Sequence, residues 1–322
     1  MSARPTVVLT GIGGKLGRLV ALRLHLQYQV VGLDPRPRPD LPAAITHLRI
    51  DPRRRRAENL FRRRQVQALV HLGGPRGATR DQEESLGAGV TGTQRLFDFC
   101  TAYQVPKVVL LSSADVYGPL PGTSQFISED TALQGDLRYP EMRSLVAIDR
   151  MGQSFYWAQP QIATVLLRPA HILGPTLRNG ASTYLRLPYY PVILGFDPLL
   201  QAIHQEDLVT AIELALAPEL RGIFNLAGTE PAPLRRVLAQ IGRPQVPVPA
   251  PLVRRAFHQL WRLGLTNFPP PEIDHLQYGS VLDTARAAAG LRLRPAWSWP
   301  KIVEQFRELG AERAGGRVGS RG

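Results

Sequence analysis

A glycine-rich turn near the N-terminus has the spacing of a phosphate-binding loop. The apolar run Val7–Leu9 precedes Gly11, Gly14 and Gly17, and apolar residues then recur at helical spacing. Gly11 permits a tight turn, Gly14 lacks a side chain that would block a pyrophosphate, and Gly17 lets the helix pack closely on the strand. A pyrophosphate would accept hydrogen bonds from free N–H groups at the positive end of the helix. The turn predicts a nucleotide site, with an ordinary glycine-rich turn as the alternative.

Asp34 closes the next apolar run, about 20 residues beyond the glycine turn. A carboxylate in that position accepts hydrogen bonds from both hydroxyls of an adenosine ribose and repels the 2′-phosphate of NADP. Arg36 and Arg38 follow closely and could offset this repulsion. The sequence favours NAD as the cofactor and leaves NADP possible. A solvent-facing turn aspartate is the alternative.

Three further side chains could carry out acid–base chemistry beside a nicotinamide. Ser113 follows the apolar run 107–112, Tyr139 lies 26 residues later, and Arg143 comes four residues after Tyr139. Hydride transfer between a carbinol and a nicotinamide requires one proton to move in step, and a tyrosine with a pKa of about 10 must be shifted toward neutrality to move it. A fixed positive charge nearby, such as that of Arg143, favours the phenolate.

Together these motifs resemble the extended short-chain dehydrogenases/reductases of the NAD-dependent epimerase/dehydratase family, in particular its epimerase-like members. The resemblance implies a serine that orients the substrate oxygen, a tyrosine that donates or accepts the proton, and a lysine that binds the nicotinamide ribose and lowers the pKa of the tyrosine. These catalytic roles fall on Ser113, Tyr139 and Arg143. The resembling segments, which cover most of residues 5–300, are Thr10–Gly17, Val70–Gly74, Val90–Phe99, Leu111–Gly118, Leu167–Pro175, His204–Ala211, Gly222–Gly228 and Val281–Leu291.

The resemblance also implies contacts to the cofactor and to the substrate. Asp51 is expected near the adenine. The expected cofactor-binding residues are Thr10, Gly11, Gly13, Gly14, Lys15, Leu16, Gly17, Asp34, Asp51, Leu72, Gly73, Gly74, Tyr139, Arg143 and Pro169. The expected substrate-binding residues are Asp115, His171, Gln201 and His204, and a structural, hydrogen-bonded role is the alternative for both histidines. The sequence predicts no metal, because its His, Cys and Asp residues lack metal-ligand spacing.

The chain departs from the family pattern where catalysis would occur. Arg143 replaces the lysine, and a planar guanidinium is not equivalent to a compact ammonium. Pro140 biases Tyr139 away from helical dihedral angles, which makes the placement of Tyr139 and Arg143 on one helical face less secure. Gly89 stands where the family usually has asparagine, and His171 and Gln201 stand where its sugar-nucleotide members often carry asparagine and arginine. A non-catalytic NAD(P)-binding sensor or scaffold is therefore the alternative to an enzyme.

Around these motifs, short apolar runs alternate with helical patterns. Such strands, separated by helices, are typical of a parallel sheet covered on both faces. The predicted class is α/β, a doubly wound parallel sheet (Rossmann) with a smaller C-terminal substrate-binding domain. Strands are expected at Thr6–Leu9, Val30–Leu33, Leu48–Ile50, Ala68–Leu72, Lys107–Ser112, Ala163–Leu167 and Gly222–Ala227. Helices are expected at Lys15–Leu26, Ala57–Arg64, Val90–Tyr103, Met142–Trp157, Asp207–Ala217 and Leu252–Leu263.

The domain organisation follows from where this alternation loosens. An NAD(P)-binding domain is expected over residues 1–173 and 201–229. The smaller domain is expected over residues 174–200 and 230–309. Residues 310–322, rich in Gly, Arg and Ala, are expected to form a disordered tail.

The net charge of +13 rests on 39 basic residues, of which only three are lysines. The densest patch, Arg53–Arg56 with Arg62–Arg64, is interpreted as a solvated helix face, and an anionic partner is the alternative. Because no recognition motif accompanies it, no nucleic-acid partner is expected. The amphipathic helix at 252–263 is expected to pack on its own domain, with a membrane or a partner as the alternative.

The remaining expectations concern compartment and assembly. No run approaches the roughly 18 apolar residues of a membrane span. Cys100 is the only cysteine, so no internal disulfide can form, and a cytoplasmic location is expected. The expected partner is a small-molecule substrate. The family resemblance implies a possible homodimer through the helices at 90–103 and 142–157.

Overall fold

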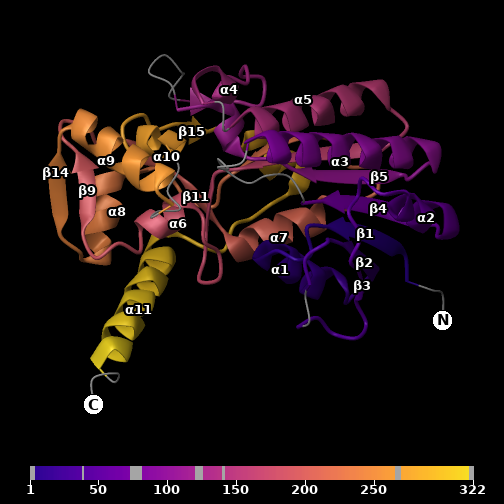
Figure 1. Cartoon of the computed structure of the whole chain (residues 1–322), viewed down its shortest axis with the longest axis horizontal. Helices are drawn as coiled ribbons and strands as arrows, with labels where there is room; N and C mark the ends of the chain where they lie inside the picture. The colour runs from indigo at the N-terminus through magenta and orange to yellow at the C-terminus, as the bar shows by residue number, and fades with distance from the viewer. Residues whose placement is uncertain are drawn as a thin grey trace.

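Seven parallel strands form the central sheet of the computed structural model, which describes residues 4–37, 40–72, 82–119, 126–139, 142–264 and 270–318. Their order across the sheet is β12-β7-β5-β4-β1-β2-β3 (Figure 1), with the chain reversing direction across the sheet beside β1. This is the doubly wound order that the sequence predicted. The strands are β1 Thr6–Thr10, β2 Gln29–Leu33, β3 Thr46–Leu48, β4 Val66–His71, β5 Lys107–Leu111, β7 Ala163–Pro169 and β12 Gly222–Leu226.

Helices cover both faces of this sheet, because successive strand residues point to opposite sides. Val7 and Leu9 enter one core with α1 (Lys15–Leu24), α7 (Gln205–Leu214) and the short π-helix η3 (Ala287–Leu291). Val8 enters the other core, with α2 (Arg55–Arg63), α3 (Gln82–Ala102) and α5 (Arg143–Ala158). Residues buried on both faces explain why the strands read as continuous apolar runs.

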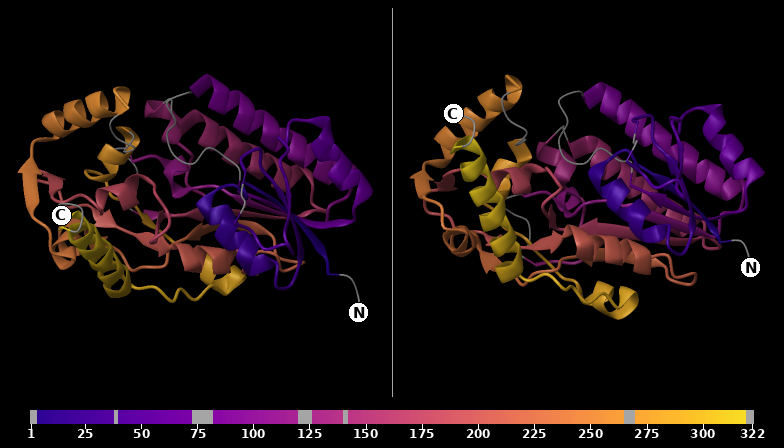
Figure 2. Two further views of the ribbon diagram at one scale, coloured as in Figure 1. Left: turned by 60° about the horizontal axis from the view of Figure 1, so that its bottom comes forward. Right: turned by 90° about the horizontal axis from the view of Figure 1, so that it is seen from below.

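A smaller lobe with its own core lies beside the carboxyl ends of β5, β7 and β12 (Figures 1 and 2). Tyr190, Leu238, Ile273 and Phe306 are buried in this core. The elements of the lobe and its connections are β8 His171–Leu173, α6 Gly180–Tyr184, β9 Tyr190–Ile193, β10 Leu199–Leu200, β11 Ala202–His204, β13 Ala232–Pro233, α8 Leu234–Ile241, β14 Gln245–Val248, α9 Ala250–Arg262, α10 Pro270–His275 and α11 Trp299–Val318.

The segment that follows β5 forms a third small cluster between the two lobes. It contains η1 (Ala114–Tyr117), β6 (Phe126–Ile127) and α4 (Gly135–Arg138), and β6 pairs with β15 (Val281–Leu282) from the C-terminal part of the chain. Tyr117, Ile127, Tyr139 and Leu282 are buried together here. Residues distant in sequence are thereby brought to the carboxyl edge of the sheet.

Two expectations change in the structure. The tail predicted to be disordered from residue 310 instead continues α11 as far as Val318. The helix expected from residue 90 begins earlier, at Gln82. The predicted fold class is confirmed, whereas the residue boundaries of the two domains stay a prediction. Within the described ranges, no helix combines the length and apolar character needed to cross a membrane.

Candidate active site

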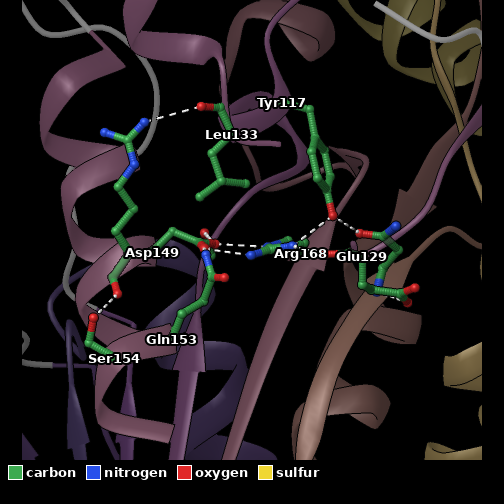
Figure 3. A network of polar contacts seen from close by, with 10 residues as sticks. Tyr117, Glu129, Leu133, Asp149, Gln153, Ser154 and Arg168 are labelled. Carbon is green, nitrogen blue, oxygen red and sulfur yellow. Dashed lines mark hydrogen bonds and ion pairs between the residues drawn. The ribbon is translucent and has the colours of Figure 1, made fainter. Parts of the chain in front are cut away.

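A buried ion pair links strand β7 to helix α5 beneath the site (Figure 3). Arg168 of β7 and Asp149 of α5 have no exposed side-chain surface. Nε of Arg168 donates to Oδ2 of Asp149 at 2.9 Å, and Nη2 donates to Oδ1 at 2.6 Å. Ser112, directly after β5, donates to the same carboxylate at 2.6 Å. The carboxyl ends of β5 and β7 are thus fixed to α5.

The same guanidinium extends the network toward β12. Nη1 of Arg168 donates to the Tyr117 hydroxyl at 2.8 Å and to the Glu129 carbonyl at 3.1 Å. Tyr117 donates in turn to Oδ1 of Asn225, in β12, at 2.7 Å (Figure 3 shows Tyr117 and Arg168). A buried arginine is tolerated only when its donors are satisfied in this way. The network therefore holds the residues that follow three parallel strands in fixed positions.

The glycine turn between β1 and α1 has the backbone of an anion site. Gly11 has φ +77°, in the left-handed region that favours glycine. A Cβ at Gly17 would lie 2.1 Å from the Gly11 carbonyl oxygen, so only glycine fits there. Gly14 is the N-cap of α1 and supplies no side-chain cap. The first turn, which begins at the exposed Lys15 and the buried Leu16, keeps its N–H groups available for a phosphate.

Asp34 lies beside this turn, as predicted, but its carboxylate is already fully engaged. Oδ1 accepts hydrogen bonds from N and Nε of Arg36 at 2.9 and 3.0 Å. Oδ2 accepts from Nη2 of Arg36 at 2.8 Å and from the Gly13 N–H at 3.1 Å. Burial raises the pKa of Asp34, but the hydrogen bonds and charge of Arg36 outweigh it and hold the pKa below 3.8. A ribose diol would reach Asp34 only after Arg36 moved aside.

The other expected cofactor residues lie along the same edge. The Thr10 hydroxyl is 2.6 Å from Nδ1 of His71, whose Nε2 is 2.9 Å from the Thr93 hydroxyl. Asp51 accepts hydrogen bonds from Arg53 at the start of α2, at 2.9 Å from the backbone N–H. Of the remaining expected residues, Leu72 and Pro169 are buried at the ends of β4 and β7, and Gly73 and Gly74 lie outside the described residues.

Ser113 and Asp115 meet two histidines at the edge of the sheet. Ser113, the N-cap of η1, donates from Oγ to Oδ2 of Asp115 at 2.9 Å. Nε2 of His275, at the end of α10, lies 3.5 Å from Oδ1 of Asp115. The ring of His171, at the start of β8, packs edge-on against His275 with centroids 4.9 Å apart. Both lobes thus contribute to one polar cluster, which we call the Asp115–His275 cluster.

This cluster has perturbed ionisation. Burial raises the pKa of Asp115, but the hydrogen bond and charge of His275 and the charge of His171 outweigh it and lower the pKa to about 2. Burial lowers the pKa of His171 to about 4, helped by the charge of His275 and opposed by Asp115. At neutral pH Asp115 is therefore ionised and His171 is neutral. Titratable groups whose pKa values are shifted by burial and by a neighbouring charge are typical of sites for proton transfer.

A cavity between the lobes opens onto these groups. Asp115, His171, His275 and Gln201 line it together with apolar residues of β10 and β15. Oε1 of Gln201 accepts a hydrogen bond from the Leu282 N–H at 2.8 Å, so Gln201 also fixes β15 in the cavity wall. Three of the four expected substrate residues thus line one cavity.

His204 is placed differently from the other expected substrate residues. It is fully buried as the N-cap of α7, where Nδ1 accepts from the Glu206 N–H at 3.3 Å. Its Nε2 lies 3.3 Å from Oε1 of Gln305, and its ring stacks on Trp297 at a centroid distance of 3.6 Å. Burial lowers its pKa. Both ring nitrogens make structural contacts, which is the alternative that the sequence left open.

The expected Tyr139–Arg143 arrangement does not form within one helix. Tyr139 is the C-cap of α4 with extended dihedral angles, and it precedes α5, of which Arg143 is the first residue. The Tyr139 hydroxyl donates to Oδ2 of Asp274, whose Oδ1 also accepts from Nε of Arg254 at 3.1 Å. Arg143 itself is exposed. The change of direction agrees with the bias that Pro140, outside the described residues, imposes on its predecessor.

Sequence reasoning missed Asp274, His275 and Arg254. They belong to the smaller lobe, where no motif marks them. Asp274 and His275 lie on α10 and contact Tyr139 and Asp115, and Arg254 lies on α9 and contacts Asp274. The adjacent acid and imidazole at 274–275 were the one available signal. Among the described residues, no group of three or more His, Cys, Asp or Glu side chains could hold a metal ion.

The curated relatives are themselves uncharacterised. One protein of Mycobacterium tuberculosis (strain H37Rv) is 29% identical over 256 residues, which are 77% of this chain and 66% of that protein. A second is 28% identical over 145 residues, or 44% of this chain and 16% of that protein. The chain thus spans slightly less than two thirds of the length of the longer match.

Several solved structures share the fold over nearly their whole length. UDP-glucose 4-epimerase of Thermotoga maritima, solved with UDP-glucose, has TM-score 0.73 and 15% identity, covering 96% of this chain and 99% of its own. UDP-glucuronic acid 4-epimerase of Bacillus cereus, solved with NAD, has TM-score 0.73 and 16% identity, covering 95% and 96%. A short-chain dehydrogenase/reductase superfamily protein of Agrobacterium tumefaciens with bound NAD has TM-score 0.74 and 20% identity, covering 97% and 99%.

The match to a sequence family agrees with the fold that the strand order and the glycine turn indicate. The NAD dependent epimerase/dehydratase family matches residues 7–227, which contain the whole central sheet except Thr6, the first residue of β1. That span includes the glycine turn, Asp34 and the Ser113–Asp115 corner. The chain therefore belongs to the NAD-dependent epimerase/dehydratase family.

Proposed function

We propose that this protein is an NAD-dependent oxidoreductase of the epimerase/dehydratase type that acts on a small substrate bearing a hydroxyl or carbonyl group. The observation that carries the proposal is the placement of the glycine turn and the Asp115–His275 cluster on one edge of one sheet. NAD would supply hydride transfer, with its pyrophosphate on the uncapped start of α1. Solved structures of the same fold contain NAD, which supports this cofactor.

A substitution at the helix start tests cofactor binding. Gly14→Asp places a carboxylate at the N-cap of α1, where aspartate is a favourable cap. Its Cβ would lie 3.3 Å from the Gly11 carbonyl oxygen, so circular dichroism melting is used to check that the variant is folded. The same negative charge repels a pyrophosphate, so the affinity for NAD should fall about a hundredfold. Isothermal titration calorimetry with NAD and NADP measures the change. Gly14→Asn, of matched size but neutral, is the control and should lose clearly less affinity than Gly14→Asp.

Unchanged NAD affinity in Gly14→Asp would place the nucleotide elsewhere. Gly92→Ala provides a second control, because a Cβ at this α3 position would make only ordinary contacts, 3.9 Å from Arg53. Gly92→Ala should bind NAD as the wild type does. Loss of binding in this variant would indicate a general effect on the fold.

For the chemical step we propose roles for Ser113, Tyr139 and Asp115. The Ser113 hydroxyl, fixed by its hydrogen bond to Asp115, orients the substrate oxygen. The Tyr139 hydroxyl exchanges a proton with that oxygen. In the structure this hydroxyl donates a hydrogen bond to Asp274. Arg143 supplies positive charge in place of the family's lysine. The cavity that contains His171, Gln201 and His275 holds the rest of the substrate.

Substituting Tyr139 tests the catalytic proposal. Tyr139→Phe removes the only proton that this side chain can exchange, so turnover should be lost while NAD affinity stays unchanged. The readout is the nicotinamide absorbance of protein and NAD mixed with sugar nucleotides or simple sugars, UDP-glucose and UDP-glucuronic acid being the first probes. His171 and Gln201 differ from the residues of many sugar-nucleotide enzymes, so the panel should extend beyond those two. Unchanged turnover in Tyr139→Phe would remove Tyr139 from the mechanism.

A second candidate is a non-catalytic NAD(P)-binding sensor or scaffold. The engagement of Tyr139 by Asp274 and the exposed position of Arg143 favour it. In this case NAD binds, the Gly14→Asp variant loses it, and no probe reduces it. Reduction of bound NAD by any probe would exclude the sensor.

We also propose a cytoplasmic homodimer. The compartment rests on the single cysteine, Cys100, which is buried and unpaired. The dimer rests on the paired helices α3 and α5, which lie side by side on the outside of the sheet (Figure 1).

A further inference from the structure

Only part of the apolar surface of helix α9 packs against the rest of the protein. It lies at the outer edge of the smaller lobe, away from the central sheet (Figures 1 and 2). Val253 is buried with 3% of its surface exposed, and Phe257, one turn later, packs against the same core. Val253 is the only buried residue of the helix. The exposed residues of α9 include Leu252, Arg255, Ala256, Leu260 and Arg262.

Next to this buried stripe runs an exposed apolar stripe. Leu252, Ala256, Leu260 and Leu263 follow one another at spacings of four, four and three residues, which places them on one side of a helix. The exposed fractions of the three leucines are 59%, 38% and 69%. A run of exposed leucines along one helix flank marks a contact surface more often than isolated exposed leucines do.

The sequence segment around this stripe carries charge of a single sign. The sequence contains no Asp or Glu between Glu230 and Glu272. Arg254 is engaged by Asp274 at 2.9 Å. Arg255 and Arg262 are exposed, and neither forms an ion pair with any described residue. The six arginines of residues 231–264 are Arg235, Arg236, Arg243, Arg254, Arg255 and Arg262.

We propose that α9 docks the protein on an anionic lipid bilayer. The stripe Leu252–Leu263 enters the boundary between headgroups and acyl chains, and Arg255 and Arg262 pair with lipid phosphates. An arginine-rich helix with leucines on its other flank and no acidic residue fits such a surface by charge and by polarity. The proposal concerns attachment and is independent of the reaction at the Asp115–His275 cluster.

Helix α2 provides the internal comparison that favours lipid over nucleic acid. It is richer in arginine, with four in nine residues against three in thirteen for α9, but its apolar residues Ala57, Leu60 and Phe61 are all buried. A basic helix without exposed apolar surface is a solvated face. A nucleic acid would engage the arginines of either helix through its phosphates and would leave the leucines of α9 without a counterpart. A bilayer uses both features of α9, whereas a nucleic acid uses only its arginines.

Co-sedimentation of the full-length protein with lipid vesicles tests the proposal. We expect binding to vesicles of equal parts phosphatidylcholine and phosphatidylglycerol, and none to vesicles of phosphatidylcholine alone. R255Q/R262Q should weaken the partition coefficient about fivefold per arginine. L252S/L263S should weaken it about tenfold or more. Circular dichroism melting confirms that each variant is folded.

Two matched variants separate docking by α9 from the general effect of a +13 charge. R62Q/R63Q removes two exposed arginines from α2, and L26S/L137S removes leucines with exposed fractions of 62% and 72% elsewhere. Both should bind vesicles as the wild type does. The proposal is overturned if the wild type ignores anionic vesicles or if these variants lose as much binding as the α9 variants. It is also overturned if the α9 variants lose binding to a short DNA duplex but keep binding to vesicles.

Discussion

At the scale of single residues, the side chain of Arg36 changes what the carboxylate of Asp34 can bind. Asp34 alone would accept both ribose hydroxyls of NAD, but Arg36 fills most of its acceptor positions and brings a cation to the same spot. A guanidinium there also matches the geometry of a 2′-phosphate. We therefore expect the pair to make the protein more tolerant of NADP than an unaccompanied aspartate would.

Removing this guanidinium should sharpen the preference for NAD. In Arg36→Ala, Asp34 becomes free for the ribose and the cation beside the 2′-position is lost. A charge-assisted hydrogen bond contributes about 1.5–3 kcal/mol, so the ratio of NAD to NADP affinity should rise about tenfold or more. Fluorescence titration with NADH and NADPH measures the ratio. Arg23→Ala, which breaks an ion pair elsewhere on α1, should leave it unchanged, and an unchanged ratio in Arg36→Ala would contradict the assignment.

His171 should make the protein less stable in mild acid. Its pKa is about 4 in the folded protein against 6.5 ordinarily, so the unfolded chain binds the proton more readily. Stability is therefore greatest above pH 6.5 and falls as the pH drops from 6.5 toward 4. Asp115, with a pKa of about 2, stays ionised throughout this window.

Urea unfolding at several pH values between 7.5 and 5 checks this prediction, the range being set by the two pKa values of His171. His171→Gln should flatten the loss of stability on acidification, because no neutral imidazole then has to be kept buried. His258→Gln, at an exposed position of α9, should leave the slope as it is in the wild type. Equal slopes in the wild type and His171→Gln would show that His171 does not titrate in this way.

The residues that the sequence identified and those it missed differ in how the chain positions them. Gly11, Gly14 and Asp34 are placed by the strand and turn next to them, so their spacing alone locates them. His275 and Asp274 reach the site through contacts of α10 with Asp115 and Tyr139, more than a hundred residues earlier in the chain, and no local pattern encodes these contacts. The sequence analysis identified Arg36, but the hydrogen bonds of Arg36 to Asp34 depend on a side-chain rotamer that sequence spacing does not specify.

At the scale of whole elements, the buried Arg168–Asp149 pair ties the sheet to α5. Asp149→Asn keeps the shape of the side chain but leaves Arg168 buried without its counter-charge. Removing one partner of a buried pair costs about 3–5 kcal/mol, so the free energy of unfolding should fall by that amount. Because the pair fixes the ends of β5 and β7, the substrate cavity should lose order as well. Urea unfolding measures the first effect.

Another aspartate–arginine pair involving α5 serves as the control. Arg150 donates to Asp136 at 2.8 Å, but about half of the Arg150 side chain is exposed (53%). Such surface pairs contribute about 0–1 kcal/mol, so Asp136→Asn should have little effect on unfolding. Equal destabilisation by the two substitutions would show that burial of the Arg168–Asp149 pair is not what makes it important.

Strands and helices could be predicted from the sequence where a single hydrophobic periodicity dominated. The strands of the central sheet are apolar runs buried on both faces, and they were located to within a few residues. The region between β5 and α5 was harder, because η1, α4 and β6 are short and β6 is completed by β15, more than a hundred residues away in sequence. Pro140 made the placement of Tyr139 and Arg143 on one helical face less secure, and in the structure Tyr139 ends α4 whereas Arg143 begins α5.

At the scale of the whole molecule, α3 and α5 present the surface on which a homodimer would form. The two helices pack together on one face of the sheet, and a groove between them is lined by Phe97, Thr101, Met151 and Ser154. Trp157, at the end of α5, is 75% exposed. A groove with apolar residues at its base and a large aromatic side chain beside it is suited to bury against a second copy.

Sedimentation velocity should therefore show a dimer, and arginines placed in the groove should dissociate it. In Thr101→Arg/Ser154→Arg, each copy would bring two new cations into a buried interface, where like charges are strongly unfavourable. Ala43→Arg, at an exposed loop position far along the chain from both helices, should leave the dimer intact. Because neither substituted position belongs to the cavity or the glycine turn, NAD affinity per chain should stay unchanged in the monomeric variant. A wild-type monomer, or a dimer that survives both arginines, would move the interface away from α3 and α5.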